Sequence, residues 1–320
     1  MPSVVYLILI SSLECLAMSY LPPVDFLIAI LWGITLLMAG KYLNAELLSI
    51  MLGLNLLLLY GLSGSSNLFF ILIIGIPAFI MGQLLIRNRS YYEVQKWGML
   101  TVVLLVSLFL GLAYFSPGNT GPGYRQMEID QSVAESLKVY EDSGFLTFYA
   151  QQGVNPEEMK QDLVLITRWW FMHLPAFYYW VGILSVYLVL VLGEIIGRRW
   201  SQPIVGRKPF REEMMPWQLT GVVIAGLSLW LWGWGTANSW YYTGSNLVLI
   251  MLPITAYFGL ANLVYQRAKL NSNLQRGGLS LIIIATMIVI PPIMIFIALL
   301  GLFDSLLDYR KINHEKGDLA

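Results

Sequence analysis

The chain has 320 residues, of which 57% are hydrophobic and 12% charged, and its formal net charge is zero. A soluble domain has about 45–50% apolar and about 25% charged residues, so a water-exposed fold would leave too much hydrocarbon uncovered. The absence of net charge argues against a nucleic-acid partner, and the one cysteine, Cys15, excludes an intrachain disulfide.

Apolar segments follow one another along the chain, and each is a candidate membrane-spanning helix. Their approximate ranges are 4–20, 24–40, 45–62, 68–86, 97–115, 166–193, 217–235, 245–265 and 278–303. A helix needs about 20 residues to cross about 30 Å of hydrocarbon, so the first two segments are short. Pro22-Pro23 separates them, which fits either two short tilted spans or a broken hairpin. The pattern predicts an all-α membrane protein, a polytopic helical bundle of about 8–9 transmembrane helices.

One long polar stretch, Ser116–Asp162, interrupts this pattern and carries eight acids against three bases. Within it, Val133, Leu137 and Tyr140 recur near helical spacing, which predicts a short amphipathic helix over 127–141. Asn155-Pro156-Glu157-Glu158 is a strong helix start, because Asn caps, Pro suits the first turn and carboxylates meet the positive end of the helix dipole. We expect this second helix to run into the sixth apolar segment, with a kink near Pro175.

Basic residues gather in three of the connections between apolar segments, which predicts that these connections are cytoplasmic. They are Arg87, Arg89 and Lys96, then Arg198, Arg199, Arg207, Lys208 and Arg211, and finally Arg267, Lys269 and Arg276. The acidic loop 116–162 is then external. Residues 1–115 form about five spans, 116–165 an external segment with short helices, 166–312 about three or four spans, and 313–320 a polar tail. Pro291-Pro292 lies inside the last apolar segment, so that segment is either a crossing or a re-entrant element, and the side of the C-terminus stays open.

Short motifs in the C-terminal half resemble those of the YybS-like family of uncharacterised bacterial membrane proteins. The matching stretches are 206–211 (GRKPFR), 215–217 (MPW), 244–247 (GSNL), 259–262 (GLAN) and 300–311 (LGLFDSLLDYRK). The resemblance covers about residues 155–312, whereas the first 115 residues agree only in hydropathy and spacing. It marks Pro209, Phe210, Arg211, Pro216, Gly301, Asp304, Asp308 and Arg310 as motif positions.

That family is distantly similar to the substrate-binding S subunits of energy-coupling-factor transporters. The resemblance implies S-subunit-like helix packing, a membrane-embedded site for a small solute and a location in the bacterial inner membrane. S subunits usually have six spans and lack a long acidic external insert, so this chain departs from their pattern.

The candidate ligand-binding residues are polar groups at bilayer depth, which are costly to bury in lipid, and aromatic residues at the membrane boundary. They are Glu14, Asn55, Gln83, His173, Trp180 and Asn246. Each has a structural interpretation as well. Glu14 either faces a cavity or pairs with a hydroxyl group, and Asn55 and Gln83 either bind solute or join helices. The aromatic cluster around His173 and Trp180 fits an interfacial belt or a cavity mouth, and His173 bonds to headgroups or senses pH. Asn246 caps or opens the eighth segment.

The terminal residues Asp304, Asp308 and Arg310 predict an ion pair that holds the last helix end, although Arg310 reaches either acid only if the chain bends. No catalytic, metal or cofactor signature is present, which predicts a protein that is not an enzyme. The leading hypothesis is a transporter-like protein that binds a small solute in a cavity among segments four to eight. The alternative is a scaffold or assembly factor that docks a membrane or cytoplasmic partner, with membrane lipids as surroundings in either case. A third hypothesis is an ion-coupled carrier that uses Glu14.

Overall fold

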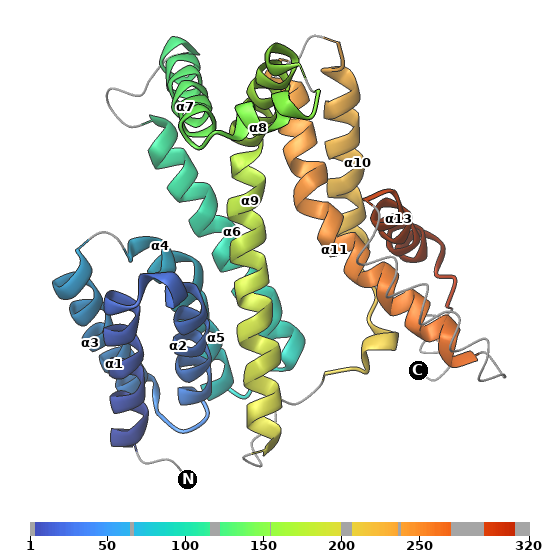
Figure 1. Cartoon of the computed structure of the whole chain (residues 1–320). Helices are drawn as coiled ribbons and strands as arrows, with labels where there is room; N and C mark the ends of the chain where they lie inside the picture. Colours follow the sequence, from blue (N-terminus) through green and yellow to red (C-terminus); the bar gives the residue numbers. More distant parts are fainter. Residues whose placement is uncertain are drawn as a thin grey trace. The chain divides into compact units, whose positions relative to one another are not determined.

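The structure is all-helical over the residues that it describes (Figure 1). It is a computed structural model, and it describes residues 4–64, 67–115, 122–153, 155–199, 207–235, 238–269 and 291–310. Within these residues, six helices are long and apolar enough to cross a membrane, and shorter apolar helices span Val4–Tyr20, Trp217–Trp232 and Ile293–Leu307. The predicted class, a polytopic helical membrane protein, is therefore confirmed.

The chain divides into two compact units, which we call unit 1 (Met1–Arg207) and unit 2 (Lys208–Ala320). The elements of unit 1 are α1 (Val4–Tyr20), η1 (Pro22–Val24), α2 (Asp25–Ala39), α3 (Ala45–Ser63), α4 (Leu68–Phe70), η2 (Ile71–Gly75), α5 (Ile76–Ile86), α6 (Tyr91–Phe115), α7 (Pro122–Asp142), α8 (Phe145–Gln151) and α9 (Pro156–Arg199). Those of unit 2 are η3 (Phe210–Glu212), α10 (Trp217–Trp232), α11 (Ser239–Lys269) and α13 (Pro291–Leu307). The sixth apolar segment thus packs with the N-terminal helices, although it follows the polar stretch in sequence.

Some predicted features fall outside the described residues. These are residues 116–121, the part of the ninth apolar segment before Pro291 together with Arg276, and the tail 313–320. The described part of the ninth segment is α13, which begins at Pro291. Proline suits the first turn of a helix, where its missing N–H has no intrahelical partner. Whether the segment crosses the membrane or re-enters it stays a prediction.

The first two apolar segments form a helical hairpin in unit 1. Helices α1 and α2 pack against each other, and the short 3-10 turn η1 at Pro22–Val24 joins them. Helix α3 also packs on α1, and its N-terminus is capped by Asn44, whose Oδ1 accepts a hydrogen bond from Leu47 N at 2.9 Å. Helix α1 therefore lies against both α2 and α3, and its Ser11 is fully buried.

Small residues let α2 approach the fourth apolar segment closely. A Cβ atom on Gly40 would lie 2.3 Å from Gly82 O, and one on Gly75 would lie 2.3 Å from the Trp32 ring. The fourth segment contains a π-helical turn, η2, immediately before α5. Helix association in lipid depends on such close packing, because lipid supplies no hydrophobic driving force between helices.

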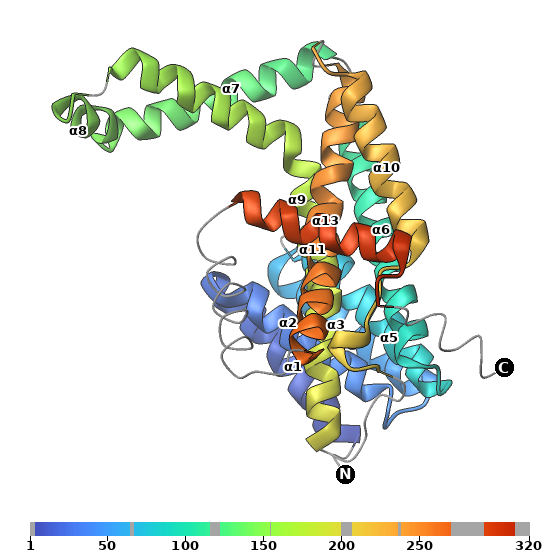
Figure 2. The same ribbon diagram turned by 90° about the vertical axis from the view of Figure 1, so that its right-hand side faces the viewer.

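The polar stretch folds into helices, as predicted. Helix α7 covers the expected range 127–141, and its Glu141 pairs with Lys160 of α9 at 2.7 Å, while Asp130 pairs with Arg168 at 3.0 Å. Helix α9 begins at Pro156, with Asn155 Oδ1 accepting from Glu157 N at 3.1 Å, and continues through the sixth apolar segment to Arg199. Pro175 lies inside α9, and Figure 2 shows that this helix bends.

The arginine-rich turns of unit 1 and its acid-rich helix α7 lie at opposite ends of its helices. The turn between α5 and α6, which holds Arg87 and Arg89, lies at the same end as Arg198 and Arg199 at the end of α9 (Figure 1). Helices α7 and α8 lie at the other end. This separation matches the arrangement that the positive-inside rule requires, and the side of the membrane on which each end lies stays a prediction.

In unit 2, α11 packs against both α10 and α13. At the crossing with α13, the backbones meet at two glycines, since a Cβ on Gly301 would lie 2.6 Å from Gly259 N. Gly301, a motif position, is therefore required by close helix packing. Pro216 immediately precedes α10 as its N-cap residue.

Candidate functional site

A polar cluster lies where α1 meets α2 and α3. Thr35 Oγ1 of α2 donates a hydrogen bond to Glu14 Oε1 at 2.9 Å. Ser11 Oγ of α1 contacts Asn55 Oδ1 of α3 at 3.3 Å. Ser11 and Glu14 are three residues apart on α1, about one helical turn or about 4.5 Å along the axis. The two contacts are therefore neighbours inside the bundle, and we call these residues the α1 polar cluster.

Two polar atoms of the α1 polar cluster are buried without a partner among the described residues. They are Glu14 Oε2, an acceptor, and Asn55 Nδ2, a donor. Asn55 is fully buried, and no charged residue occurs in 26–40 or 47–86 that could neutralise the carboxylate from α2, α3 or the fourth segment. An unsatisfied buried polar group costs about 1–3 kcal/mol. The cluster thus has a hydrogen-bonding capacity that the described residues leave unused.

Gln83 lies away from this cluster and joins helices. Its Nε2 donates to Ala45 O at the start of α3, at 3.3 Å. The turn before α3 also holds Lys41, and burial lowers the pKa of its amino group. The observed contact of Gln83 therefore joins α5 to α3, as the helix-joining interpretation expects.

His173 does not project towards lipid headgroups, and that expectation is wrong. Its side chain is buried in α9, where Nδ1 lies 2.8 Å from Trp169 O and the ring lies 4.5 Å from the Trp169 ring. Residues four apart share one face of a helix, so His173 lies next to Trp169 and contacts it. Trp180 also lies on α9, where its ring meets Phe177 edge to face at 5.0 Å.

The aromatic residues of α9 divide between outward and inward positions. Trp169 and Trp170 are about half exposed, as an interfacial belt requires. Tyr178 points inward and packs against Phe69 of α4 and Phe109 of α6, at 5.5 and 5.7 Å between ring centroids. Segments four to six belong to unit 1, and segments seven and eight belong to unit 2. A cavity among all five therefore stays a prediction.

Asn246 does not cap the eighth segment, and that expectation is wrong. Helix α11 begins earlier, at Ser239, and Asn238 Oδ1 accepts from the backbone N–H groups of Trp240 and Tyr241 at 3.1 and 3.2 Å. Asn246 Nδ2 instead donates to Tyr242 O of its own helix at 2.8 Å. The stretch 239–244 (SWYYTG) precedes the aliphatic run and is helical as well. Its low hydropathy placed the expected helix start too late.

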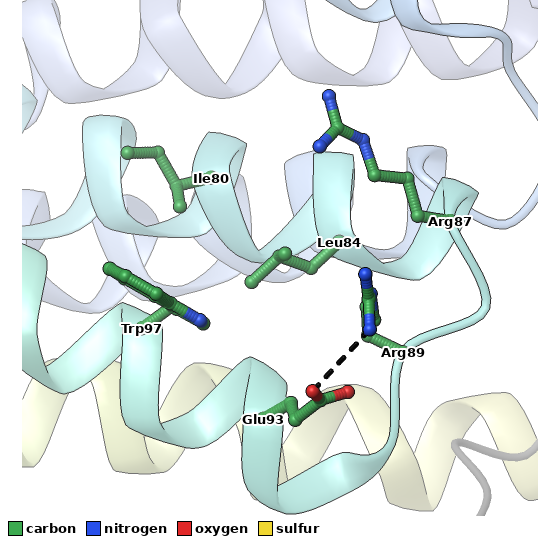
Figure 3. A pocket seen from close by; sticks show the side chains of 6 residues that line it. All are labelled: Ile80, Leu84, Arg87, Arg89, Glu93 and Trp97. Atoms are coloured by element: carbon green, nitrogen blue, oxygen red, sulfur yellow. Dashed lines mark ion pairs between the residues drawn. The ribbon is translucent and has the colours of Figure 1, made fainter.

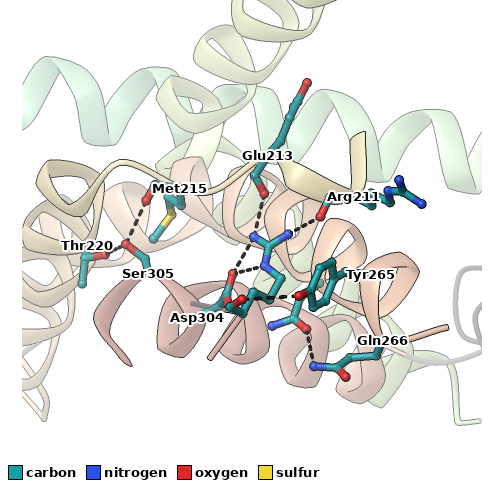
Figure 4. Close-up of polar contacts among 10 residues, drawn as sticks. Arg211, Glu213, Met215, Thr220, Tyr265, Gln266, Asp304 and Ser305 are labelled. Atoms are coloured by element: carbon teal, nitrogen blue, oxygen red, sulfur yellow. Dashed lines mark hydrogen bonds and ion pairs between the residues drawn. The ribbon is translucent and has the colours of Figure 1, made fainter. Parts of the chain in front are cut away.

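Two motif positions of unit 2, Arg211 and Asp304, contact a third, Arg310 (Figure 4). Its buried guanidinium pairs with Asp304 Oδ2 at 2.6 Å and donates to Arg211 O at 2.6 Å and Glu213 O at 2.7 Å. The expected ion pair is thus present, with Asp304 as the partner. Asp308 follows the end of α13 with φ of 43°, which turns the chain back so that Arg310 reaches Asp304. Asp tolerates this left-handed region better than most residues.

Further contacts attach residues 209–216 to the helices of unit 2. Phe210 packs edge to face against Tyr257, whose hydroxyl hydrogen-bonds to the Glu213 carboxylate. Ser305 Oγ of α13 donates to Met215 O at 2.9 Å. Together with the bonds of Arg310, these contacts join residues 209–216 to α11 and α13.

Sequence reasoning missed a buried acid at the end of α9. Glu194 is 1% exposed and pairs with Arg198 at 2.6 Å and with Arg207 at 2.8 Å. Arg207 also lies over the Tyr91 ring. The available signal was an acid inside an apolar run with an arginine four residues later, a spacing that brings two side chains together on a helix.

An open groove of about 410 Å³ lies between α5 and α6 (Figure 3). Ile80, Leu84, Arg87, Arg89, Glu93 and Trp97 line it. No three His, Cys, Asp or Glu side chains gather as a metal site among the residues that the structure covers.

Six long apolar helices among the described residues and buried polar contacts between helices define an integral membrane protein with several helical spans. The chain belongs to the family described as Predicted membrane protein (DUF2232), whose model matches residues 8–305. No curated protein and no solved structure matches the chain.

Proposed function

We propose that the protein is a transporter-like membrane protein, without enzymatic activity, that binds a small solute at the α1 polar cluster. The supporting observation is the pair of buried, unpartnered atoms Glu14 Oε2 and Asn55 Nδ2. At bilayer depth no water replaces a missing partner, and an unsatisfied group costs several kcal/mol. A bound solute supplies the missing contacts and thereby lowers the free energy of the bundle.

The two unpartnered atoms limit the chemistry of that solute. Glu14 Oε2 accepts a hydrogen bond, so the solute brings an N–H or O–H group or a positive charge. Asn55 Nδ2 donates, so the solute also brings an acceptor such as a carbonyl or carboxylate oxygen. The helices around the cluster pack closely, which favours a small solute.

The wider proposal places the chain in the YybS-like family with S-subunit-like helix packing. The bacterial inner membrane is then its location, with the basic ends of the helices in the cytoplasm and loop 116–162 outside. Separation of the basic turns from α7 and α8 within unit 1 supports this topology. A reporter fused near Ala134 tests it, because a cytoplasmic reporter there contradicts the orientation.

Thermal unfolding of the purified protein in detergent, in the presence of vitamins, amino acids and other small metabolites, tests solute binding. We expect at least one class of solute to raise the unfolding temperature, because ligands that bind only the folded state stabilise it. The variants Glu14→Gln and Asn55→Leu should need at least ten times more solute for the same rise in unfolding temperature. Gln83→Leu is the matched control, since it removes an amide that joins two helices outside the cluster.

Two outcomes contradict the proposal. In the first, no class of solute stabilises the protein. In the second, solutes stabilise the Glu14 and Asn55 variants as strongly as the parent chain. If solute binds, uptake into proteoliposomes with and without a proton gradient then tests the ion-coupled version, in which Glu14→Gln retains folding and loses the dependence on the gradient.

A scaffold that docks a partner protein is the second candidate function, and the α7–α8 segment favours it. Ion pairs of α7 with Lys160 and Arg168 hold this segment on α9, and Met127, Val139 and Phe148 project with most of their apolar surface exposed. Exposed apolar side chains on a fixed polar segment suit a protein interface. Affinity purification from native membranes in mild detergent should recover a stoichiometric partner. Recovery of the protein alone contradicts a scaffold.

A further inference from the structure

The groove between α5 and α6 combines an apolar wall with a cationic rim. Ile80 and Leu84 of α5 and Trp97 of α6 form the wall, and Arg87 and Arg89 in the connecting turn form the rim (Figure 3). Glu93 also lines the groove, at 3.5 Å from Arg89. Both arginines and Trp97 are exposed, so the groove opens to the surroundings of the helices.

The depth of the groove matches the boundary of a bilayer. Ile80 lies six residues before the end of α5, and Trp97 six residues after the start of α6. At 1.5 Å per residue, both lie about 9 Å from the arginine turn. Each polar layer of a bilayer is about 5–8 Å thick. The groove therefore extends from the headgroup layer into the hydrocarbon, and a half-exposed tryptophan at this depth is typical of the interface.

The charge of the rim favours an anion. Glu93 offsets Arg89 through an exposed pair, whereas Arg87 makes no ion pair among the described residues. Two guanidinium groups against one carboxylate leave a net positive charge. The planar guanidinium matches phosphate oxygens well, because it donates two parallel hydrogen bonds.

We propose that this groove binds one anionic phospholipid, with its phosphate between Arg87 and Arg89 and an acyl chain along Ile80, Leu84 and Trp97. The occupant must be amphiphilic, because the rim is cationic and the wall apolar. A free phosphate ion satisfies the rim alone. A zwitterionic lipid brings an ammonium group whose one acidic partner in the groove, Glu93, is already paired with Arg89. The proposal is independent of the solute site, since no residue of the α1 polar cluster lines the groove.

Thermal unfolding in nanodiscs tests the proposal. Discs of phosphatidylcholine are compared with discs that contain one fifth phosphatidylglycerol. The test variant is Arg87→Gln/Arg89→Gln, and the control is Arg199→Gln/Arg267→Gln, which removes the same charge from two other basic helix ends and leaves the groove intact. We expect phosphatidylglycerol to raise the unfolding temperature of the parent and the control equally, and that of the test variant by less than half as much. All proteins should unfold alike in phosphatidylcholine, which verifies that the variants fold.

A second measurement locates the lipid. Phosphatidylglycerol with brominated chains quenches nearby tryptophan fluorescence, so it should quench the parent more than brominated phosphatidylcholine does. This difference should disappear in Trp97→Phe and in the test variant, and remain in the control. Equal responses of test and control variants to phosphatidylglycerol overturn the proposal, because surface attraction then explains the effect. Equal stabilisation by inorganic phosphate overturns it too, because the site then needs no lipid.

Discussion

Arg310 offers the sharpest test of the fold, because its charge is buried and its partners are few. The side chains of Arg310 and Asp304 are 0% and 1% exposed, and the guanidinium also holds the carbonyls of Arg211 and Glu213. Removing one partner of a buried ion pair costs about 3–5 kcal/mol, since the other charge stays buried without compensation. We therefore expect Arg310→Gln to lower the free energy of unfolding by about this amount.

Arg211→Gln provides a control of identical chemistry in the same network. Arg211 contributes its backbone carbonyl to Arg310, while its own side chain is half exposed and lies 3.8 Å from Glu212. Exposed substitutions of this kind change stability by about 0.5 kcal/mol or less. Unfolding in mixed micelles with increasing dodecyl sulfate, followed by helical circular dichroism, measures both variants. In addition, Asp304→Asn/Arg310→Gln should be more stable than Arg310→Gln, because no uncompensated charge remains. Equal losses for Arg310→Gln and Arg211→Gln would refute the reasoning.

The same assay checks two further features. Gly40→Ala should destabilise unit 1 by about 1–3 kcal/mol, because its Cβ would overlap the backbone of Gly82. Gly53→Ala, which faces open space, should be neutral or stabilising, and comparable losses at both glycines would contradict the close approach. Asn238→Ala should cost about 1 kcal/mol through loss of the α11 cap. Asn246→Ala should cost less, and the reverse order would restore Asn246 as the cap.

The class of protein and most helix positions were predictable from sequence, because they depend on local properties. Lipid requires about 20 consecutive apolar residues for each span, and this requirement is visible in composition alone. The start of α9 at Pro156 was also predictable, since Asn155 caps the adjacent turn. The start of α11 was not, because its first turns lack aliphatic residues, and the backbone hydrogen bonds to Asn238 reveal where the helix begins.

The partners of polar residues required the tertiary structure. The sequence left both Asp304 and Asp308 open as partners of Arg310, and the positive φ of Asp308 decides for Asp304. Glu14 likewise had several interpretations, and only the structure shows that its Oε1 accepts from the Thr35 hydroxyl while its Oε2 has no partner among the described residues.

Sequence by itself determined that this chain is a helical membrane protein with basic connections and an acidic helical segment, because each of these properties resides in consecutive residues. Only the tertiary structure decided which polar groups meet, as in the contact of Ser11 with Asn55 across 44 positions and of Arg310 with the Arg211 carbonyl across 99. The physical reason is that helix packing in lipid depends on shape and close approach, and these do not follow from hydropathy.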